Sequence, residues 1–170
     1  NSWRQSSCVI FFDKYAGGVI CNFLGLFNRR SYGNIKIKRV LVIQLWGIGE
    51  TILTLPAIEA LRKKFPKAEI SILATSRNED VYCNNKKIDN TIKINLNLFS
   101  VLNFVAKNIK KYDLAIDMEE YLNISAIISF FTGKRIVGYS HNPRAKLYTH
   151  TVKYNAKQHA VQTFLDLVRD

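Results

Sequence analysis

The sequence is poor in the residues that build disulfide frameworks and metal sites. It contains 3 cysteines, Cys8, Cys21 and Cys83, which lie far apart and form no Cys-x-x-Cys pair. No histidine stands at metal-ligand spacing from them, so the sequence supports neither a disulfide framework nor a zinc site. This cysteine usage is typical of a protein in a reducing compartment.

Long apolar runs and acidic residues are also scarce. No uninterrupted apolar run reaches the roughly 20 residues that a membrane-spanning helix needs. The chain begins with Asn1 in place of an initiator methionine, so we expect a trimmed chain or a fragment. The 13 Asp and Glu residues stand against 25 Lys and Arg, a formal net charge of +12. The surface should attract phosphate groups, nucleic acid or acidic lipid headgroups, and charge alone does not choose among them.

What the sequence does have is an alternation of short β-branched runs and helical patterns. Its 170 residues, 48% of them hydrophobic, suffice for one domain with a core. Strands are expected at 39–45, 68–74, 90–95, 113–118 and 135–140, with an extended segment at 148–154. Helices are expected at 50–64, 80–84, 98–112, 122–131 and 156–168, with a turn at 132–134. This order predicts an α/β, Rossmann-like, mostly parallel sheet flanked by helices.

The first part of the chain differs from the rest. Residues 1–33 are expected to form an amphipathic helical segment ahead of a Rossmann-like domain at 34–170, because apolar positions recur at helical spacing over 12–27. Each glycine within this helix weakens it by roughly 1 kcal/mol relative to alanine, so it needs an apolar surface to stay folded. That surface is either the domain's own core or a membrane, whose anionic headgroups would suit the basic cluster at 29–39.

The loop after the first strand has a glycine pair, Gly47 and Gly49, but lacks two known phosphate-binding patterns. Ile52 stands where a dinucleotide fingerprint needs its third glycine, and the Gly-Lys-Ser/Thr ending of a P-loop is absent. What remains is a tight turn with the carboxylate of Glu50 at a helix N-terminus. The helix dipole is expected to lower the pKa of Glu50. Glu50 is then either a simple first-turn charge or a base that accepts a proton from an attacking hydroxyl.

Other candidates follow the later strands. Carboxylates at 117–120 could bind sugar hydroxyls or assist proton transfer, and Asp117 could equally cap the next helix. Basic residues that could contact anions at the cleft rim, or simply be solvated, are Arg77, His141, Arg144, His150, Lys157 and His159. In a parallel sheet the strand-to-helix loops 46–50, 75–78, 117–121 and 140–144 should converge on one cleft. No motif of a nucleic-acid-binding module is readable, so no nucleic-acid partner is predicted.

Taken together, several blocks carry a family resemblance. They are KRVLVIQLWGIGETILTLPAIEALRKKFPKAEISIL, YDLAIDME, GKRIVGY, YTHTVKYN and KQHAVQTFLDLV, in order from about Lys38 to the end. They resemble the N-terminal half of the ADP-heptose:lipopolysaccharide heptosyltransferases, glycosyltransferase family 9. The resemblance implies a GT-B fold, with the acceptor on the N-terminal domain and the nucleotide-sugar donor on the C-terminal one. It also implies metal-independent inverting transfer with no cofactor, the donor being a substrate such as ADP-heptose.

The resemblance also implies site residues. The family's acid after the glycine turn, usually Asp and regarded as the general base, aligns with Glu50, which extends the carboxylate by one methylene. The family's DxQG pattern corresponds to 117–120, where the amide and the glycine are lost, so we expect an acceptor other than the usual core sugar. The residues expected to bind the acceptor are Gly47, Gly49, Asp117, Glu119, Arg144 and His159, and no metal ligand is expected.

These implications give a set of expectations about the whole protein. The donor-binding residues should lie beyond Asp170, so this piece alone is expected to be inactive. The partner is expected to be an acidic, lipopolysaccharide-core-like glycolipid, met in the cytoplasm or peripherally on the inner face of the cytoplasmic membrane, with no obligate protein partner. Two other classes remain open: a non-catalytic domain that binds glycan or lipid, and a different nucleotide-dependent α/β enzyme.

Overall fold

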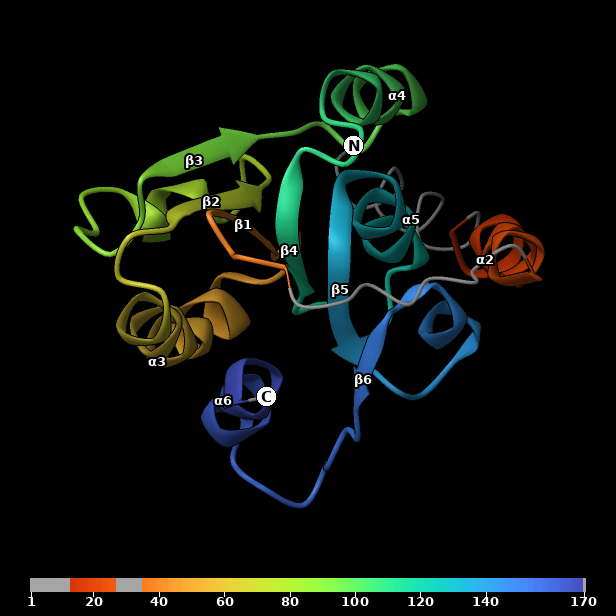
Figure 1. Ribbon diagram of the computed structural model, residues 1–170. Coiled ribbons are helices and arrows are strands. Elements are labelled where there is room, and N and C mark those ends of the chain that lie inside the picture. Colours follow the sequence, from red (N-terminus) through yellow and green to blue (C-terminus); the bar gives the residue numbers. More distant parts are fainter. Residues whose placement is uncertain (1–12, 27–34, 170) are drawn as a thin grey trace.

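The structure, a computed structural model, describes residues 13–26 and 35–169 and contains one six-stranded sheet (Figure 1). The strands are β1 (Arg39–Ile43), β2 (Glu69–Ala74), β3 (Asn90–Lys93), β4 (Tyr112–Asp117), β5 (Gly133–Tyr139) and β6 (His150–Val152). They lie in the order β3-β2-β1-β4-β5-β6, and every neighbouring pair is parallel. This confirms the predicted α/β class and its parallel sheet.

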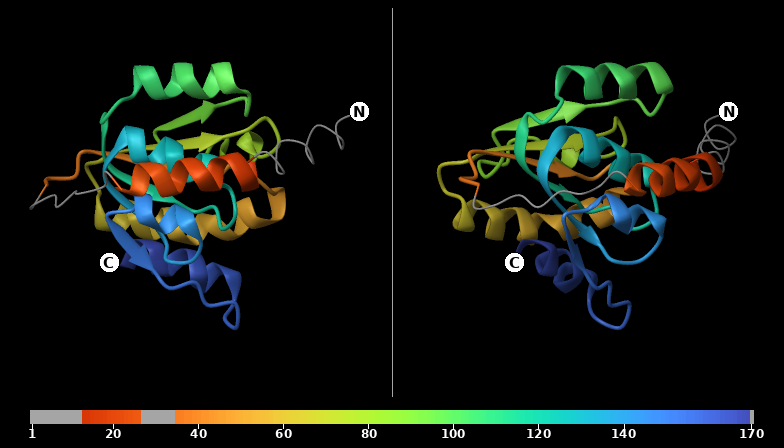
Figure 2. Two further views of the ribbon diagram at one scale, coloured as in Figure 1. Left: turned by 90° about the vertical axis from the view of Figure 1, so that its right-hand side faces the viewer. Right: turned by 45° about the vertical axis from the view of Figure 1, so that its right-hand side comes forward.

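Two layers of helices cover the sheet (Figures 1 and 2). One face carries α3 (Ile48–Lys64) and α6 (Ala160–Arg169), which we call the α3/α6 layer. The other carries α4 (Leu98–Lys107), α5 (Asn123–Thr132) and α2 (Gly18–Leu26), which we call the α2/α4/α5 layer. Short helical turns complete the described chain: η1 (Asp13–Gly17), η2 (Glu79–Tyr82) and η3 (Pro143–Leu147).

Alternation along the buried strands sends side chains into both layers. On β1, Val40 and Val42 pack in one cluster with Ile58 and Leu61 of α3. Leu41 of the same strand packs in the opposite cluster, which includes residues of α4 and α5. Because successive side chains of a strand point to opposite faces, a fully apolar run such as β1 requires cover on both sides. The two helical layers supply it.

Some predicted boundaries were wrong. The predicted turn at 132–134 does not exist, because α5 ends at Thr132 and β5 begins at Gly133. A Cβ on Gly133 would lie 2.6 Å from Cβ of Ala115, so the close approach of β5 to β4 requires glycine there. The helix predicted to reach 112 ends at Lys107, and Lys110 then adopts a left-handed φ of 51°. The last helix begins at Ala160 and not at 156.

The N-terminal segment packs on the domain through one face only. Asp13 caps α5 by accepting the backbone N–H groups of Asn123 and Ile124, each at 2.7 Å. Cys21 is fully buried, and a Cβ on Gly17 would lie 2.7 Å from Cβ of Asn123. On its other side α2 leaves large apolar side chains exposed. Within the described residues the domain supplies the apolar surface that the glycine-rich helix requires.

The structure covers only part of the expected helical segment at 1–33 and of the expected basic cluster at 29–39. Residues 1–12 and 27–34, including Arg29 and Arg30, lie outside the described residues. None of the helices in 13–26 and 35–169 is long and apolar enough to cross a membrane.

Candidate active site

The candidate site lies where the strand order reverses. From β1 the chain proceeds outward to β2 and β3, then returns to place β4 on the other side of β1. Such a reversal opens a crevice at the carboxyl ends of the strands, which is where α/β proteins of this type bind ligands. The loops that follow β1 and β4 therefore meet beside each other, as the sequence predicted for 46–50 and 117–121.

The glycine turn after β1 begins α3 in an unusual backbone conformation. Gly47 has φ 72° and ψ 112° at the N-cap, and no side chain caps the helix. Its carbonyl accepts the backbone N–H of Thr51 at 3.0 Å and the Thr51 hydroxyl at 2.6 Å. A Cβ on Gly47 would lie 3.1 Å from Oε2 of Glu50, whereas one on Gly49 would meet nothing within 4 Å. The Glu50 carboxylate therefore folds back over the turn, and Gly49 borders open space.

The electrostatics of Glu50 differ from the sequence expectation. Partial desolvation, followed by the negative charge of Glu120, raises the pKa of Glu50 above its ordinary value. The expected lowering by the helix dipole was therefore wrong, because lost hydration and a neighbouring carboxylate outweigh the dipole. A carboxylate with a raised pKa is a stronger proton acceptor when ionised, which suits a general base.

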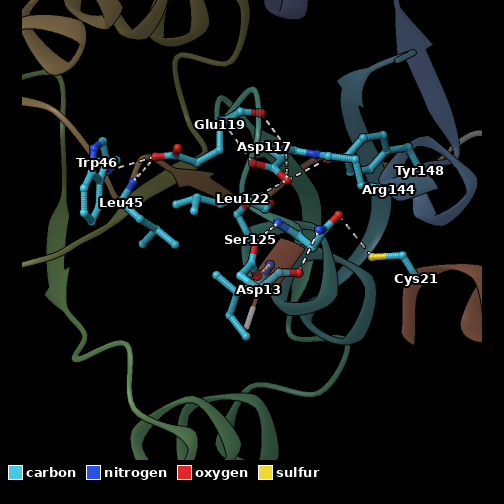
Figure 3. Close-up of polar contacts among 12 residues, drawn as sticks. Asp13, Cys21, Leu45, Trp46, Asp117, Glu119, Leu122, Ser125, Arg144 and Tyr148 are labelled. Carbon is cyan, nitrogen blue, oxygen red and sulfur yellow. Dashed lines mark hydrogen bonds and ion pairs between the residues drawn. The ribbon is translucent and has the colours of Figure 1, made fainter. Parts of the chain in front are cut away.

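Asp117 at the end of β4 lies inside the protein and not at its surface. Its Oδ2 accepts Ser125 Oγ at 2.9 Å, Arg144 Nη2 at 2.8 Å and the Tyr148 hydroxyl at 2.7 Å (Figure 3). The side chain is fully buried, and this burial raises the pKa of Asp117 despite the adjacent guanidinium. Three donors on one oxygen make Asp117 the centre of a buried network.

Glu119 joins the two loops that border the crevice. Its Oε1 accepts the backbone N–H of Leu45 at 2.5 Å and that of Trp46 at 2.9 Å (Figure 3). The residue is 5% exposed, and burial raises the pKa of Glu119 to about 8. Its side chain thereby ties the chain just after β1 to the loop after β4.

Arg144 is the internal counter-ion of this network. It is 1% exposed, and besides Asp117 its guanidinium donates to the Glu119 carbonyl and, from Nε, to the Tyr148 hydroxyl at 2.8 Å. The predicted acceptor contacts of Asp117, Glu119 and Arg144 remain predictions. Their burial favours a role in holding the loops in position.

His159 lies on the same edge of the sheet but at the surface. It is exposed just ahead of α6, and its Nδ1 accepts the backbone N–H of Val161 at 3.3 Å. The start of α6 is fixed to the end of β5, where the Tyr139 hydroxyl donates to the Thr163 carbonyl at 3.4 Å. His159 therefore borders the carboxyl edge without entering the buried network.

A cluster of ring side chains beside the carboxylates was missed by sequence reasoning. The His141 ring lies 5.2 Å from Tyr154 and 6.3 Å from Tyr121, which is 71% exposed. His141 Nε2 stands 3.8 Å from Oε1 of Glu120, and desolvation lowers the pKa of His141. Desolvation and a hydrogen bond with Glu120 raise the pKa of Tyr154 to about 12. Glu120 and His141 were noted in the sequence, but no pattern linked them to either tyrosine.

The glycine turn is also held from the β2 side. Asn78 Nδ2 donates to the Gln44 carbonyl at 2.9 Å and to the Thr51 hydroxyl at 3.0 Å, while the Thr75 hydroxyl donates to the Leu45 carbonyl at 3.0 Å. The loop after β2 thus converges with the others, as predicted. With Glu119 on one side and Asn78 on the other, the turn before Glu50 is fixed at both flanks.

No metal-binding group is visible in the part of the chain that the structure describes. Within 13–26 and 35–169 no group of three or more His, Cys, Asp and Glu side chains could hold a metal ion.

Comparison with known proteins gives matches at the level of structure alone. No protein-family model and no curated protein matches the sequence. A glycosyltransferase family 9 structure from Veillonella parvula shares 20% identity at a TM-score of 0.65, covering 81% of this chain and 42% of that one. The structure of E. coli heptosyltransferase WaaC with ADP shares 20% identity at a TM-score of 0.64, covering 76% of this chain and 45% of that one. The structure of E. coli ADP-heptose lps heptosyltransferase II shares 16% identity at a TM-score of 0.62, covering 79% of this chain and 40% of that one.

These likenesses concern the fold, because all three identities are low. The chain spans less than half the length of each of these structures. Over the part that they share, the chain has the Rossmann-like fold of the glycosyltransferase family 9 structures.

Proposed function

We propose that this chain is the acceptor-binding part of an inverting glycosyltransferase. The enzyme would transfer a heptose or a related sugar from a nucleotide-sugar donor to a lipopolysaccharide-core-like glycolipid. The observation that carries the proposal is Glu50, whose carboxylate folds over a rigid glycine turn at the strand-order reversal with its pKa raised. The fold shared with glycosyltransferase family 9 structures supports the same reaction class.

The proposed chemistry needs one proton acceptor from this chain. Glu50 takes the proton of the acceptor hydroxyl as that oxygen attacks the anomeric carbon of the donor. The new carbon–oxygen bond forms in line with the bond to the leaving nucleoside diphosphate, which departs with the bonding electron pair. This step depends on near-attack geometry, so Glu119 and Asn78, which fix the turn from either side, contribute by holding Glu50 in position.

The remaining predicted residues have supporting parts in this proposal. Gly49 leaves the backbone open to a sugar ring, since a Cβ there would meet nothing within 4 Å, whereas Gly47 lies under the Glu50 carboxylate and shapes the turn. The loops after β1 and β4 are held in position by the buried side chains of Asp117, Glu119 and Arg144. His159 presents an exposed imidazole at the edge of the crevice. The donor, such as ADP-heptose, is bound mainly by a further domain, so residues 1–170 bind acceptor without turnover. No cofactor or metal enters the step.

The test is substitution of Glu50 in a longer protein that carries the donor domain. Glu50→Gln keeps the shape of the side chain and removes the proton acceptor, so turnover is lost while acceptor affinity is retained. Glu59→Gln, on the same helix and exposed, is the matched control and leaves turnover unchanged. Near-normal turnover of Glu50→Gln would falsify the base assignment.

A non-catalytic glycan-binding domain is the second candidate, favoured by one observation. Tyr121 is 71% exposed at the carboxyl edge, and hydrogen bonding to Glu120 raises its pKa, so a ring and a carboxylate stand side by side. An aromatic face next to a carboxylate binds a sugar without chemistry. Acceptor binding that depends on Tyr121, in a longer protein without transferase activity, would favour this candidate.

A further inference from the structure

The exposed apolar side chains of the protein are unevenly distributed. Three of them, Ile48, Ile52 and Tyr121, lie on the α3 start or on the loop that carries Glu120. Every other exposed large hydrophobic side chain of the described residues lies on α2, on α4 or in the turn after α4: Val19, Ile20, Phe23, Leu26, Leu98, Phe99, Leu102 and Ile109. The side chains on α2 and α4 belong to the α2/α4/α5 layer, and Ile109 lies next to it.

Helix α4 presents these side chains on its outer side. Leu98, Phe99 and Leu102 are 75%, 81% and 58% exposed, and their spacing places them on one side of the helix. Val101 of the same helix is 5% exposed and packs against the sheet. Helix α4 is therefore apolar on both sides, although a helix on the surface of a water-soluble protein is normally polar on its outer side.

Helix α2 repeats this arrangement at the other end of the layer. Val19 is 70% exposed, Phe23 61% and Leu26 76%, while Cys21 is fully buried. Figures 1 and 2 show α2 and α4 on the same side of the sheet, with α5 between them. Two outward apolar strips therefore belong to one layer.

The charges of this layer have one sign. The residues of α2, α4 and α5 include no Asp or Glu, and Asp13 is occupied in capping α5. The turn after α4 exposes Ile109 between the exposed Lys107 and Lys111. An apolar strip flanked by lysines and free of carboxylates is complementary to a bilayer surface with anionic headgroups.

We propose that the outer face of the α2/α4/α5 layer docks on an anionic membrane surface. Phe99, Leu102 and Ile109 on one side and Phe23 and Leu26 on the other would enter the boundary between headgroups and acyl chains. Lys107 and Lys111 would lie at the headgroup level. The carboxyl edge of the sheet runs beside this layer, so docking leaves Glu50 uncovered. This inference does not depend on glycosyl transfer.

The experiment is vesicle co-sedimentation of the chain 1–170. Phosphatidylcholine vesicles with and without phosphatidylglycerol are compared at low and high salt. We expect binding that needs the anionic lipid and weakens with salt. Phe99→Glu combined with Leu102→Glu lowers the apparent partition coefficient by about tenfold or more, since two apolar side chains are lost and two charges are gained at the interface.

The matched control makes the same kind of change on the opposite layer. Ile52 of α3 is 51% exposed, and Ile52→Glu leaves vesicle binding within about twofold of the unchanged chain. Circular dichroism confirms that each variant is folded. Equal loss of binding in the Ile52 and the α4 variants would overturn the proposal, as would unchanged binding of the α4 variant.

A second copy of the chain is the competing occupant of this face. Light scattering after gel filtration measures the oligomeric state of the same proteins. A monomer that binds anionic vesicles supports the membrane. A dimer that Phe99→Glu converts to monomer, with no vesicle binding, would overturn it in favour of self-association.

Discussion

The two helical layers pack on alternate apolar residues of the same strands and differ in what they present outward. The α3/α6 layer carries Glu50, Glu59 and Asp166, and Lys64 at the end of α3 donates to the last carbonyls of α6, Val168 and Arg169, at 3.0 Å. The α2/α4/α5 layer carries no carboxylate on its helices and exposes apolar side chains. The candidate base, which needs a polar and accessible environment, therefore lies on the α3/α6 layer, and the surface suited to a membrane lies on the α2/α4/α5 layer.

The layers also differ in what lies beneath them. Under the α2/α4/α5 layer, next to α5 and η3, lies the buried ion pair of Asp117 and Arg144. We predict that Arg144→Met has the largest effect on stability, about 3 to 5 kcal/mol, because it leaves the Asp117 charge buried without its partner. Urea denaturation measures the loss. The double variant with Asp117→Asn should recover much of it, and an equal loss in single and double variants would contradict the pairing.

Adjacent glycines of the N-terminal segment offer a second way to examine this layer. A Cβ on Gly17 would lie 2.7 Å from Cβ of Asn123, whereas one on Gly18 would meet nothing within 4 Å. Gly17→Ala should therefore destabilise the chain by about 1 to 3 kcal/mol through overpacking. Gly18→Ala should be neutral or stabilising by up to about 1 kcal/mol, since alanine favours the helix. Thermal unfolding of the two variants compares them, and identical shifts would mean that the segment does not pack on α5.

The cap that joins η1 to α5 should contribute less. Asp13 accepts two N–H groups at the start of α5, so Asp13→Ala should cost about 1 kcal/mol. Asp13→Asn keeps an acceptor oxygen and should lose only part of this. Chemical denaturation gives both values. A full loss in Asn as well as Ala would indicate that charge, and not the acceptor oxygen, provides the cap.

Glu119, in the loop after β4, predicts a pH dependence of stability. Burial raises the pKa of Glu119 to about 8 in the folded chain, above its ordinary value of 4.5. The folded state therefore binds more protons than the unfolded state between these values, so the contribution of Glu119 to stability falls as pH rises from about 4.5 to 8. Unfolding free energies over this range should show a decline that Glu119→Gln reduces. A slope that is the same in both proteins would contradict the assignment.

Much of the architecture could be predicted because its signals are local. The runs at 39–45 and 113–118 are apolar enough to require buried parallel strands, and the parallel topology then brings their following loops together. Helix ends were less accurate, since the end of α4 depends on the left-handed backbone of Lys110, and β5 follows α5 without a turn because Gly133 packs against Ala115. Both depend on contacts that periodicity does not encode.

The site was harder to predict for the same physical reason. The sequence identified Glu50, Asp117, Glu119 and Arg144 as neighbours of one cleft. Their burial and protonation depend on partners far away in the chain, such as Tyr148 beneath Asp117. The pKa of Glu50 could not be given the right direction, because it depends on Glu120, which lies 70 residues later, and on the solvent lost at the turn.

The pKa of Glu50 links the structure to the proposed function. In a longer protein with the donor domain, the acidic limb of kcat/KM against pH reports the pKa of the essential base in the free enzyme. Carboxyl NMR titration of the same protein gives the pKa of Glu50 independently. We predict that the two values coincide, lie above the ordinary value for Glu, and fall together in Glu120→Gln. An acidic limb that stays in place while the Glu50 titration moves would contradict the assignment of Glu50 as the base.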